Sequence, residues 1–173
     1  MGPEAVTVPV AKLSLLLAVV LTLQHSLMAD LRIGLVQPDL LLLVAVLSGL
    51  VGGSERGAVM GFLAGLLSDL FVPTPLGLSA LTFSLIGFAA GGLQAGIIRS
   101  AWWIAPLTGF AGSVAGILLY AVLGAMMGRP HFVRLDVFVV AVGVGAMNAV
   151  LALPASWALT WGMRGGPERS FAR

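Results

Sequence analysis

The chain has few charged residues and no cysteine. Its 173 residues include only nine Lys or Arg and seven Asp or Glu, far below the roughly one quarter that is usual in soluble domains. Such a chain could not cover the surface of a water-soluble fold with polar groups, so that class is excluded. The lack of cysteine excludes disulfides, thiol catalysis, Cys-ligated zinc and a lipoprotein anchor.

Signatures of catalysis and of nucleic-acid binding are also missing. The sequence has no G-x-S-x-G, H-E-x-x-H or G-K-[ST] motif, and His25 and His131 have no companion at metal-ligand spacing. The net charge is only +2 and the basic residues are scattered, so no phosphate-tracking patch is expected. We therefore expect a protein that is not an enzyme and uses no metal, no cofactor and no nucleic acid.

Long apolar stretches fill most of the chain. Hydrophobic residues make up 59% of it, and about 20 apolar residues in a helix cross the roughly 30 Å hydrocarbon layer of a bilayer. Strand alternation is absent, and backbone polar groups in lipid must be paired, so each span is expected to be a helix. We predict six spans, at residues 8–28, 39–53, 57–72, 76–98, 102–128 and 137–163.

The predicted architecture is all-α: one polytopic six-transmembrane-helix bundle, residues 1–163, followed by a short basic cytoplasmic tail, residues 164–173. The first span lacks an A-x-A cleavage site and leads directly into further spans, so we interpret it as a retained helix. Spans two and three are short and joined by a polar turn at residues 53–56. Six full crossings are preferred over a re-entrant pair formed by these two spans.

The distribution of basic residues predicts the orientation, because cytoplasmic loops are enriched in Lys and Arg. With both termini in the cytoplasm, the cytoplasmic segments hold Lys12, Arg56, Arg99, Arg164, Arg169 and Arg173. The opposite side then holds Arg32, Arg129 and Arg134. Tryptophans lie near the predicted span ends, as an interfacial belt requires: Trp102, Trp103, Trp157 and Trp161.

Small residues recur four positions apart on several spans. Gly57, Gly61 and Gly65 do so on the third span, and Gly112 and Gly116 on the fifth. Such a stripe lets two helix backbones approach closely, which supplies much of the drive for association in lipid. The stripes either pack this chain's own bundle or dock a helix of another protein. We take these five glycines as the candidate partner interface.

Three polar residues stand out within or beside the spans. Asp69 either binds loop N–H groups around residues 74–78 or forms one wall of a ligand site, because a carboxylate in the bilayer should face protein or water. Asp39 follows a proline where a helix is expected to begin, and an acid suits that end of a helix. The candidate polar pocket is Asp39, Asp69 and Asn148. Structural turns are expected at Pro38, Pro75 and Gly77.

Three motifs lie close together between residues 37 and 81. Residues 37–43 read Q-P-D-L-L-L-L, residues 61–70 read G-F-L-A-G-L-L-S-D-L, and residues 75–81 read P-L-G-L-S-A-L. In combination they resemble the rod shape-determining protein MreD family. The sharp part of the resemblance covers residues 38–91, while size and hydropathy agree over the whole length.

The resemblance implies a multi-pass protein of the bacterial inner membrane that takes part in peptidoglycan synthesis during cell elongation. It implies no catalytic activity, and a fold similar to the substrate-binding subunits of energy-coupling-factor transporters. The main hypothesis is a non-enzymatic scaffold that binds the single-span protein MreC. MreB, RodA and a class B penicillin-binding transpeptidase belong to the same assembly, in which this chain could form a homo-oligomer. The alternatives are a vitamin-binding transporter subunit and a lipid-handling enzyme or flippase.

Overall fold

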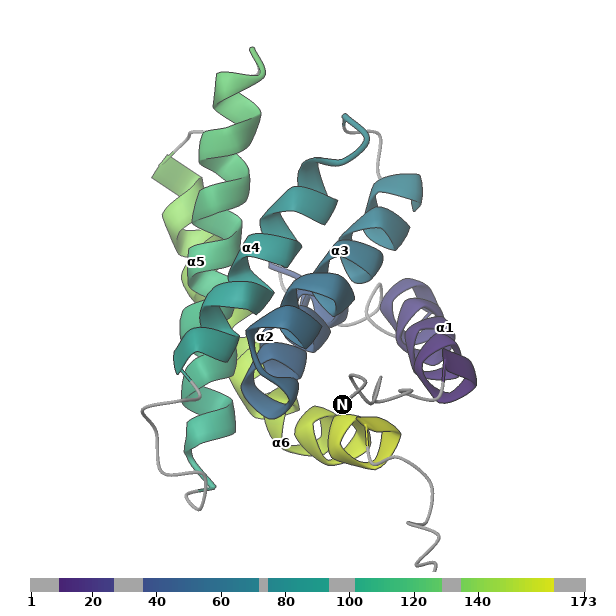
Figure 1. Cartoon of the computed structure of the whole chain (residues 1–173). Helices are drawn as coiled ribbons and strands as arrows, with labels where there is room; N and C mark the ends of the chain where they lie inside the picture. The colour runs from purple at the N-terminus through teal and green to yellow at the C-terminus, as the bar shows by residue number, and fades with distance from the viewer. Residues whose placement is uncertain (1–9, 27–35, 72–74, 94–101, 129–134, 164–173) are drawn as a thin grey trace, which may run out of the picture.

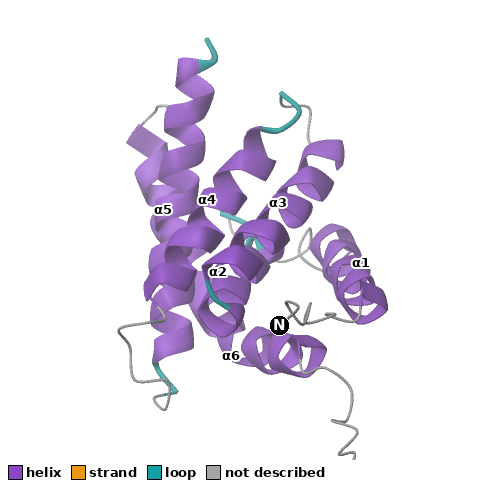
Figure 2. Cartoon of the chain, viewed as in Figure 1, coloured by secondary structure: helices purple, strands orange, loops and turns teal. Residues whose placement is uncertain are grey.

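A computed structural model describes residues 10–26, 36–71, 75–93, 102–128 and 135–163, and all regular elements in these ranges are helices (Figures 1 and 2). One helix lies within or overlaps each predicted span. Their bounds are α1 Val10–Ser26, α2 Leu40–Gly52, α3 Ser54–Phe71, α4 Leu78–Leu93, α5 Ile104–Met126 and α6 Leu135–Met163. The predicted tail, residues 164–173, lies outside the described residues.

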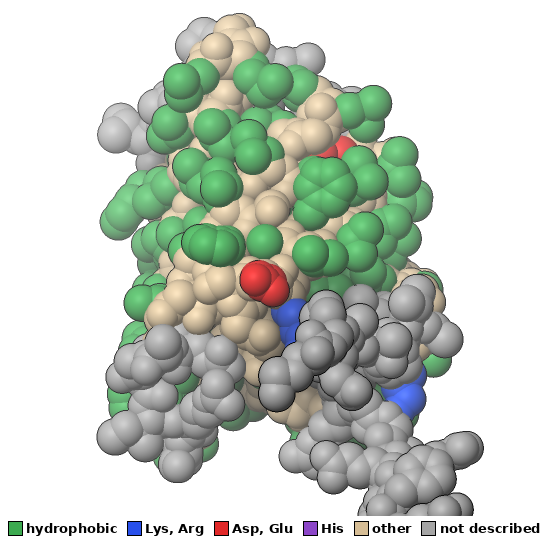
Figure 3. All heavy atoms as spheres, in the orientation of Figure 1, with side chains coloured by type: hydrophobic (Ala, Val, Ile, Leu, Met, Phe, Trp, Pro, Cys, Tyr) green, Lys and Arg blue, Asp and Glu red, His purple; other side chains and the backbone are tan. Residues whose placement is uncertain are grey.

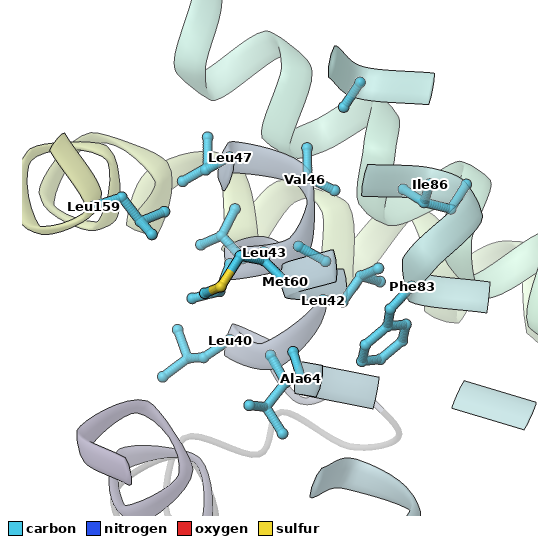
Figure 4. Close-up of a cluster of buried hydrophobic side chains, with 14 of the residues drawn as sticks. Leu40, Leu42, Leu43, Val46, Leu47, Met60, Ala64, Phe83, Ile86 and Leu159 are labelled. Carbon is cyan, nitrogen blue, oxygen red and sulfur yellow. The ribbon is translucent and has the colours of Figure 1, made fainter. Parts of the chain in front are cut away.

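Helix α2 forms the centre of the structure. Every residue from Leu40 to Gly49 is buried, and Leu43 and Leu47 are fully inaccessible. Figure 4 shows side chains from α3, α4 and α6 packed around this helix, among them Met60, Phe83 and Leu159. A helix that is apolar on every side must be surrounded by other helices or lipid. Here it is surrounded mainly by protein.

Helices α2, α3 and α4 meet backbone to backbone through glycine. A Cβ atom added to Gly49 or to Gly57 would lie 2.1 or 2.2 Å from the carbonyl oxygen of Gly87. These distances are too short for any side chain, so the three helices touch only because all three residues are glycine. The contact continues along α3 and α4, which lie side by side in Figure 1.

The connection between α2 and α3 is shorter than the sequence predicts. The polar turn was expected to occupy residues 53–56, but Gly53 alone separates the two helices, with a φ of 86°. Ser54 begins α3, and Glu55 lies in its first turn. An acid is favourable there because the free N–H groups at a helix start carry partial positive charge.

Helices α5 and α6 are the two described helices that are long and apolar enough to cross a membrane. They contain 23 and 29 residues, which correspond to about 34 and 43 Å at a rise of about 1.5 Å per residue. The exposed tryptophans lie close to the ends of these two helices: Trp102, Trp103, Trp157 and Trp161. Six full crossings remain a prediction, because α1, α2 and α4 are shorter.

Candidate functional site

The start of α2 is held by a side-chain amide from α1. Gln24 donates from Nε2 to the carbonyl oxygen of Pro38 at 3.1 Å, and its Oε1 accepts the N–H of Leu40 at 2.8 Å. Asp39 is the N-cap residue of α2, and its Oδ1 accepts the N–H of Leu42 at 3.0 Å. The predicted role of Asp39 at a helix start is therefore what the structure shows.

A second amide, from α6, holds the same segment from another direction. Asn148 accepts the backbone N–H of Asp39 at 3.2 Å and donates to the backbone carbonyl of Asp39 at 2.9 Å. The same amide nitrogen donates to Oγ of Ser113 on α5 at 2.8 Å. The side chains of Asn148 and Ser113 are fully buried. We call Gln24, Ser113, Asn148 and the backbone of residues 38–40 the α2 clamp.

The α2 clamp lies deep in the bundle. Asn148 is near the midpoint of α6, and the side chain of Val36 lies against Gly143, one turn earlier on the same helix. Residues 36–39 therefore run beside α6 without helical hydrogen bonds until α2 begins. Non-helical backbone at membrane depth is stable only where protein groups pair with it. The two amides of the clamp supply that pairing.

Asp69 performs the same task for α4. Its Oδ2 accepts the N–H groups of Gly77 at 2.8 Å and Ala80 at 3.3 Å, while its Oδ1 accepts that of Ser79 at 3.1 Å. The side chain is only 3% exposed. Because the first N–H groups of a helix have no partner within it, this carboxylate satisfies them and opposes the positive end of the helix dipole.

The turn before α4 has the geometry that its glycine predicts. The N–H of Leu78 bonds to the carbonyl oxygen of Pro75 at 3.2 Å, which closes a four-residue turn. Gly77, the third residue of that turn, has a φ of 95°. Residues with a Cβ atom rarely adopt this conformation, so glycine is required here. The turn presents the N–H of Gly77 to Asp69.

The three candidate pocket residues do not share the cavity that lies beside Asp39. Asp39 borders a cavity of about 190 Å³ between α2, α3, α4 and α5, lined also by Leu42, Ser68, Ser79, Phe83, Gly116, Ile117 and Tyr120. Asp69 and Asn148 do not line it, because their oxygens and nitrogens are directed at the backbone and at Ser113. Small-molecule sites usually measure roughly 300–1,000 Å³. The cavity therefore gives little support to a vitamin site.

The five candidate interface glycines all lie against other helices of this chain. Cβ atoms on Gly61 and Gly65 would come within 2.2 and 2.3 Å of backbone oxygens of α4. Gly57 meets α2 and α4, as described above, and Gly112 and Gly116 face side chains of α2. A partner helix could reach these stripes only by displacing α4 or α2. Of the two alternatives that the sequence left open, the structure shows these glycines packing the bundle itself, and docking of a partner helix on them stays a prediction.

Two members of the α2 clamp were not among the predicted site residues. Gln24 lies in an apolar run near the predicted outer end of the first span, and Ser113 is one of several small residues on the fifth. Both are polar groups inside predicted spans, which is the signal that could have found them. The sequence could not connect Ser113 with residues 38–40, because it reaches that segment only through Asn148, and both residues are distant from it along the chain.

Comparison with known proteins identifies the family. A family model for the rod shape-determining protein MreD matches residues 6–154. The chain belongs to the MreD family. The matched region contains every residue of the α2 clamp as well as Asp69 and its turn. No curated protein and no solved structure matched the chain.

Family membership settles the broad biological role. As an MreD family member the chain is a membrane protein with a role in determining rod shape. The family is known for its role in shape determination, and its members are not known as enzymes. The resemblance predicted from residues 38–91 is confirmed and extends along most of the chain. The expected likeness to energy-coupling-factor transporter subunits found no support among solved structures.

Proposed function

We propose that this member of the MreD family is a non-enzymatic scaffold of the cell-elongation complex in the bacterial inner membrane, and that it binds a single-span MreC-like protein. The observation that carries the proposal is the family match over residues 6–154. The packing is consistent with it: Asp39 and Asp69 hold helix ends. The described residues contain no group of three or more His, Cys, Asp or Glu that could hold a metal.

The proposed arrangement in the membrane is six spans with both termini in the cytoplasm. One transmembrane domain, residues 1–163, would then end in a basic cytoplasmic tail. Helix α2 spans only about 20 Å at about 1.5 Å per residue, but it is enclosed by protein and preceded by the extended residues 36–39. A short central helix of this kind needs no full lipid-facing length. MreB, RodA and a class B penicillin-binding transpeptidase are proposed as further members of the assembly. A homo-oligomer of this chain within the assembly is part of the same proposal.

We place the MreC-like helix on the outer face of α3. With the glycines committed to internal packing, a partner must contact outward side chains, and α3 presents a row of them at helical spacing: Val59, Phe62, Leu66 and Leu70. Hydrophobic side chains cover much of the upper part of the face shown in Figure 3, and α3 lies on this side of the molecule. Because α3 is locked to α4 backbone to backbone, this face is a rigid surface. A rigid surface is suited to favouring one conformation of a bound protein.

The test is recovery of an MreC-like protein with the tagged chain from a detergent extract. Leu66→Trp on α3 is expected to lower recovery at least tenfold, because a large side chain separates the two helices. Leu118→Trp, on the exposed side of α5, is the matched control and should leave recovery unchanged. Equal recovery with both variants would remove α3 from the interface. Failure of the unmodified protein to retain any MreC-like partner would refute the scaffold proposal.

A further inference from the structure

A second, larger cavity lies between α1, α2 and α6. Its volume is about 390 Å³, more than twice that of an engineered apolar cavity of about 150 Å³ that holds benzene. Helix α1 contributes one wall, from Lys12 to Leu23, while α2 and α6 form the others. All of its lining side chains are apolar except Lys12. We call this cavity the α1 groove.

The single charge of the α1 groove lies at one end. The Nζ atom of Lys12 is 5.4 Å from the centre of the Trp161 ring, a cation–π arrangement. Leu23 and Leu40 lie toward the other end of the lining, beside the α2 clamp. Lysine and tryptophan are the residues that anchor helices at the lipid headgroup level. The groove therefore has a polar mouth and an apolar interior.

The length of the α1 groove matches one leaflet of a bilayer. The eleven-residue step from Lys12 to Leu23 corresponds to about 16 Å at a rise of about 1.5 Å. One leaflet is half of the roughly 30 Å hydrocarbon layer. An extended lipid acyl chain has the apolar character and the length that this groove offers.

We propose that the α1 groove binds one acyl chain of an anionic phospholipid, with the phosphate of the headgroup beside Lys12. The apolar walls take the chain, and the ammonium at the mouth selects for negative charge. A basic residue near an anionic membrane surface contributes about 1 kcal/mol, which corresponds to roughly a fivefold preference over a zwitterionic lipid. The bound lipid would join α1 to α2 and α6. This proposal does not depend on the MreC-like partner.

The test uses the full chain in vesicles that contain phosphatidylglycerol or phosphatidylcholine with brominated acyl chains, which quench nearby tryptophan. Trp102, Trp103 and Trp157 are first replaced by Phe, so that Trp161 alone reports. Saturable quenching with about a fivefold preference for phosphatidylglycerol is expected. Lys12→Gln should abolish the preference. Quenching that follows only the bulk lipid fraction, equal for both lipids, would overturn the proposal.

Filling the α1 groove gives a second, independent measurement. Ala158→Phe places a ring among the lining residues and should reduce the saturable component at least fivefold, while Ala146→Phe, at an exposed position of the same helix, should not. Circular dichroism verifies that both variants are folded. If Ala158→Phe does not fold, Lys12→Gln still decides the headgroup preference. Unchanged saturable quenching in a folded Ala158→Phe variant would contradict the groove as the site.

Discussion

The side-chain amide of Asn148 and the backbone of Asp39, 109 residues apart in the sequence, exchange two hydrogen bonds, one in each direction. A side-chain amide carries an acceptor oxygen and a donor nitrogen side by side, so Asn148 can serve the N–H and the carbonyl of one residue at once. This pairing ends the extended segment 36–39 and starts α2 at a fixed place beside α6. The position of the central helix is thus set by a polar contact within an apolar bundle.

We expect Asn148→Leu to lower the free energy of unfolding by about 1–3 kcal/mol. Leucine is similar in size but leaves the N–H of Asp39 and the hydroxyl of Ser113 without this partner, and a buried unpaired group costs about 1–3 kcal/mol. Hydrogen bonds between membrane helices average about 0.6 kcal/mol, so the lower half of the range is favoured. Unfolding in mixed micelles measures the effect.

A matched control for Asn148→Leu is Thr160→Val, also on α6. The Thr160 hydroxyl bonds only to the carbonyl of Trp157 within its own helix at 2.8 Å, so its loss should cost less than about 0.5 kcal/mol. Equal stability loss for the two variants would show that the contact between α6 and Asp39 contributes nothing specific.

Asp69→Ala should destabilise the protein by about 3 kcal/mol. It removes an acceptor from three backbone N–H groups at the start of α4. Hydrogen bonds to charged groups are worth about 1.5–3 kcal/mol each, and other partners of these N–H groups recover part of that loss. Asp69→Asn keeps one acceptor oxygen and should lose about half as much. Thermal unfolding in detergent compares them, with Thr22→Val at an exposed site of α1 as control. An Asp69→Ala variant as stable as that control would contradict the capping role.

Gly61→Ala should cost about 2 kcal/mol or more, although alanine is the better helix former. The added methyl would lie 2.2 Å from the carbonyl oxygen of Phe83, and backbone must shift to relieve it. Gly92→Ala is the control, since its nearest neighbour is Oγ of Ser54 at 3.9 Å; it should be neutral or stabilising by up to about 1 kcal/mol. A neutral Gly61→Ala variant would show that α3 and α4 lie further apart than described.

The absence of cysteine makes the orientation directly testable. A single cysteine can replace Glu55, at the start of α3, or Leu76, beyond its end. Both positions are exposed. A membrane-impermeant maleimide should label Leu76→Cys in intact spheroplasts and Glu55→Cys only after permeabilisation. Labelling of both from the same side would show that α3 does not cross the membrane, and the reverse pattern would invert the proposed topology.

The helical elements could be predicted from the sequence because each is an apolar run bounded by charge, proline or glycine. The N-cap role of Asp39 and the turn at Gly77 could be predicted too, since both follow from local chemistry within a few residues. The helix against which the glycine stripe packs could not be predicted. A repeat such as Gly57, Gly61 and Gly65 indicates that the backbone of another helix will approach closely. It does not indicate whether that helix belongs to the same chain.

The α2 clamp shows the same limit for polar groups. Gln24, Ser113 and Asn148 each indicate a hydrogen bond inside the bilayer. Gln24 and Asn148 bond to the main chain of residues 38–40, which carries no residue-specific signal, and Ser113 bonds to the amide of Asn148. Only the three-dimensional arrangement of α1, α5 and α6 shows that Gln24 and Asn148 meet at one short segment, with Ser113 bonded to Asn148.

The α2 clamp also bears on how the protein is made. Gln24 is synthesised before α2 and can pair with Pro38 and Leu40 as soon as that segment leaves the ribosome, whereas Asn148 emerges only with the last helix. Until then the backbone N–H of Asp39 lacks its partner on α6. We expect nascent chains cut before residue 148 to be degraded rapidly in the cell, so that only completed copies are available for assembly.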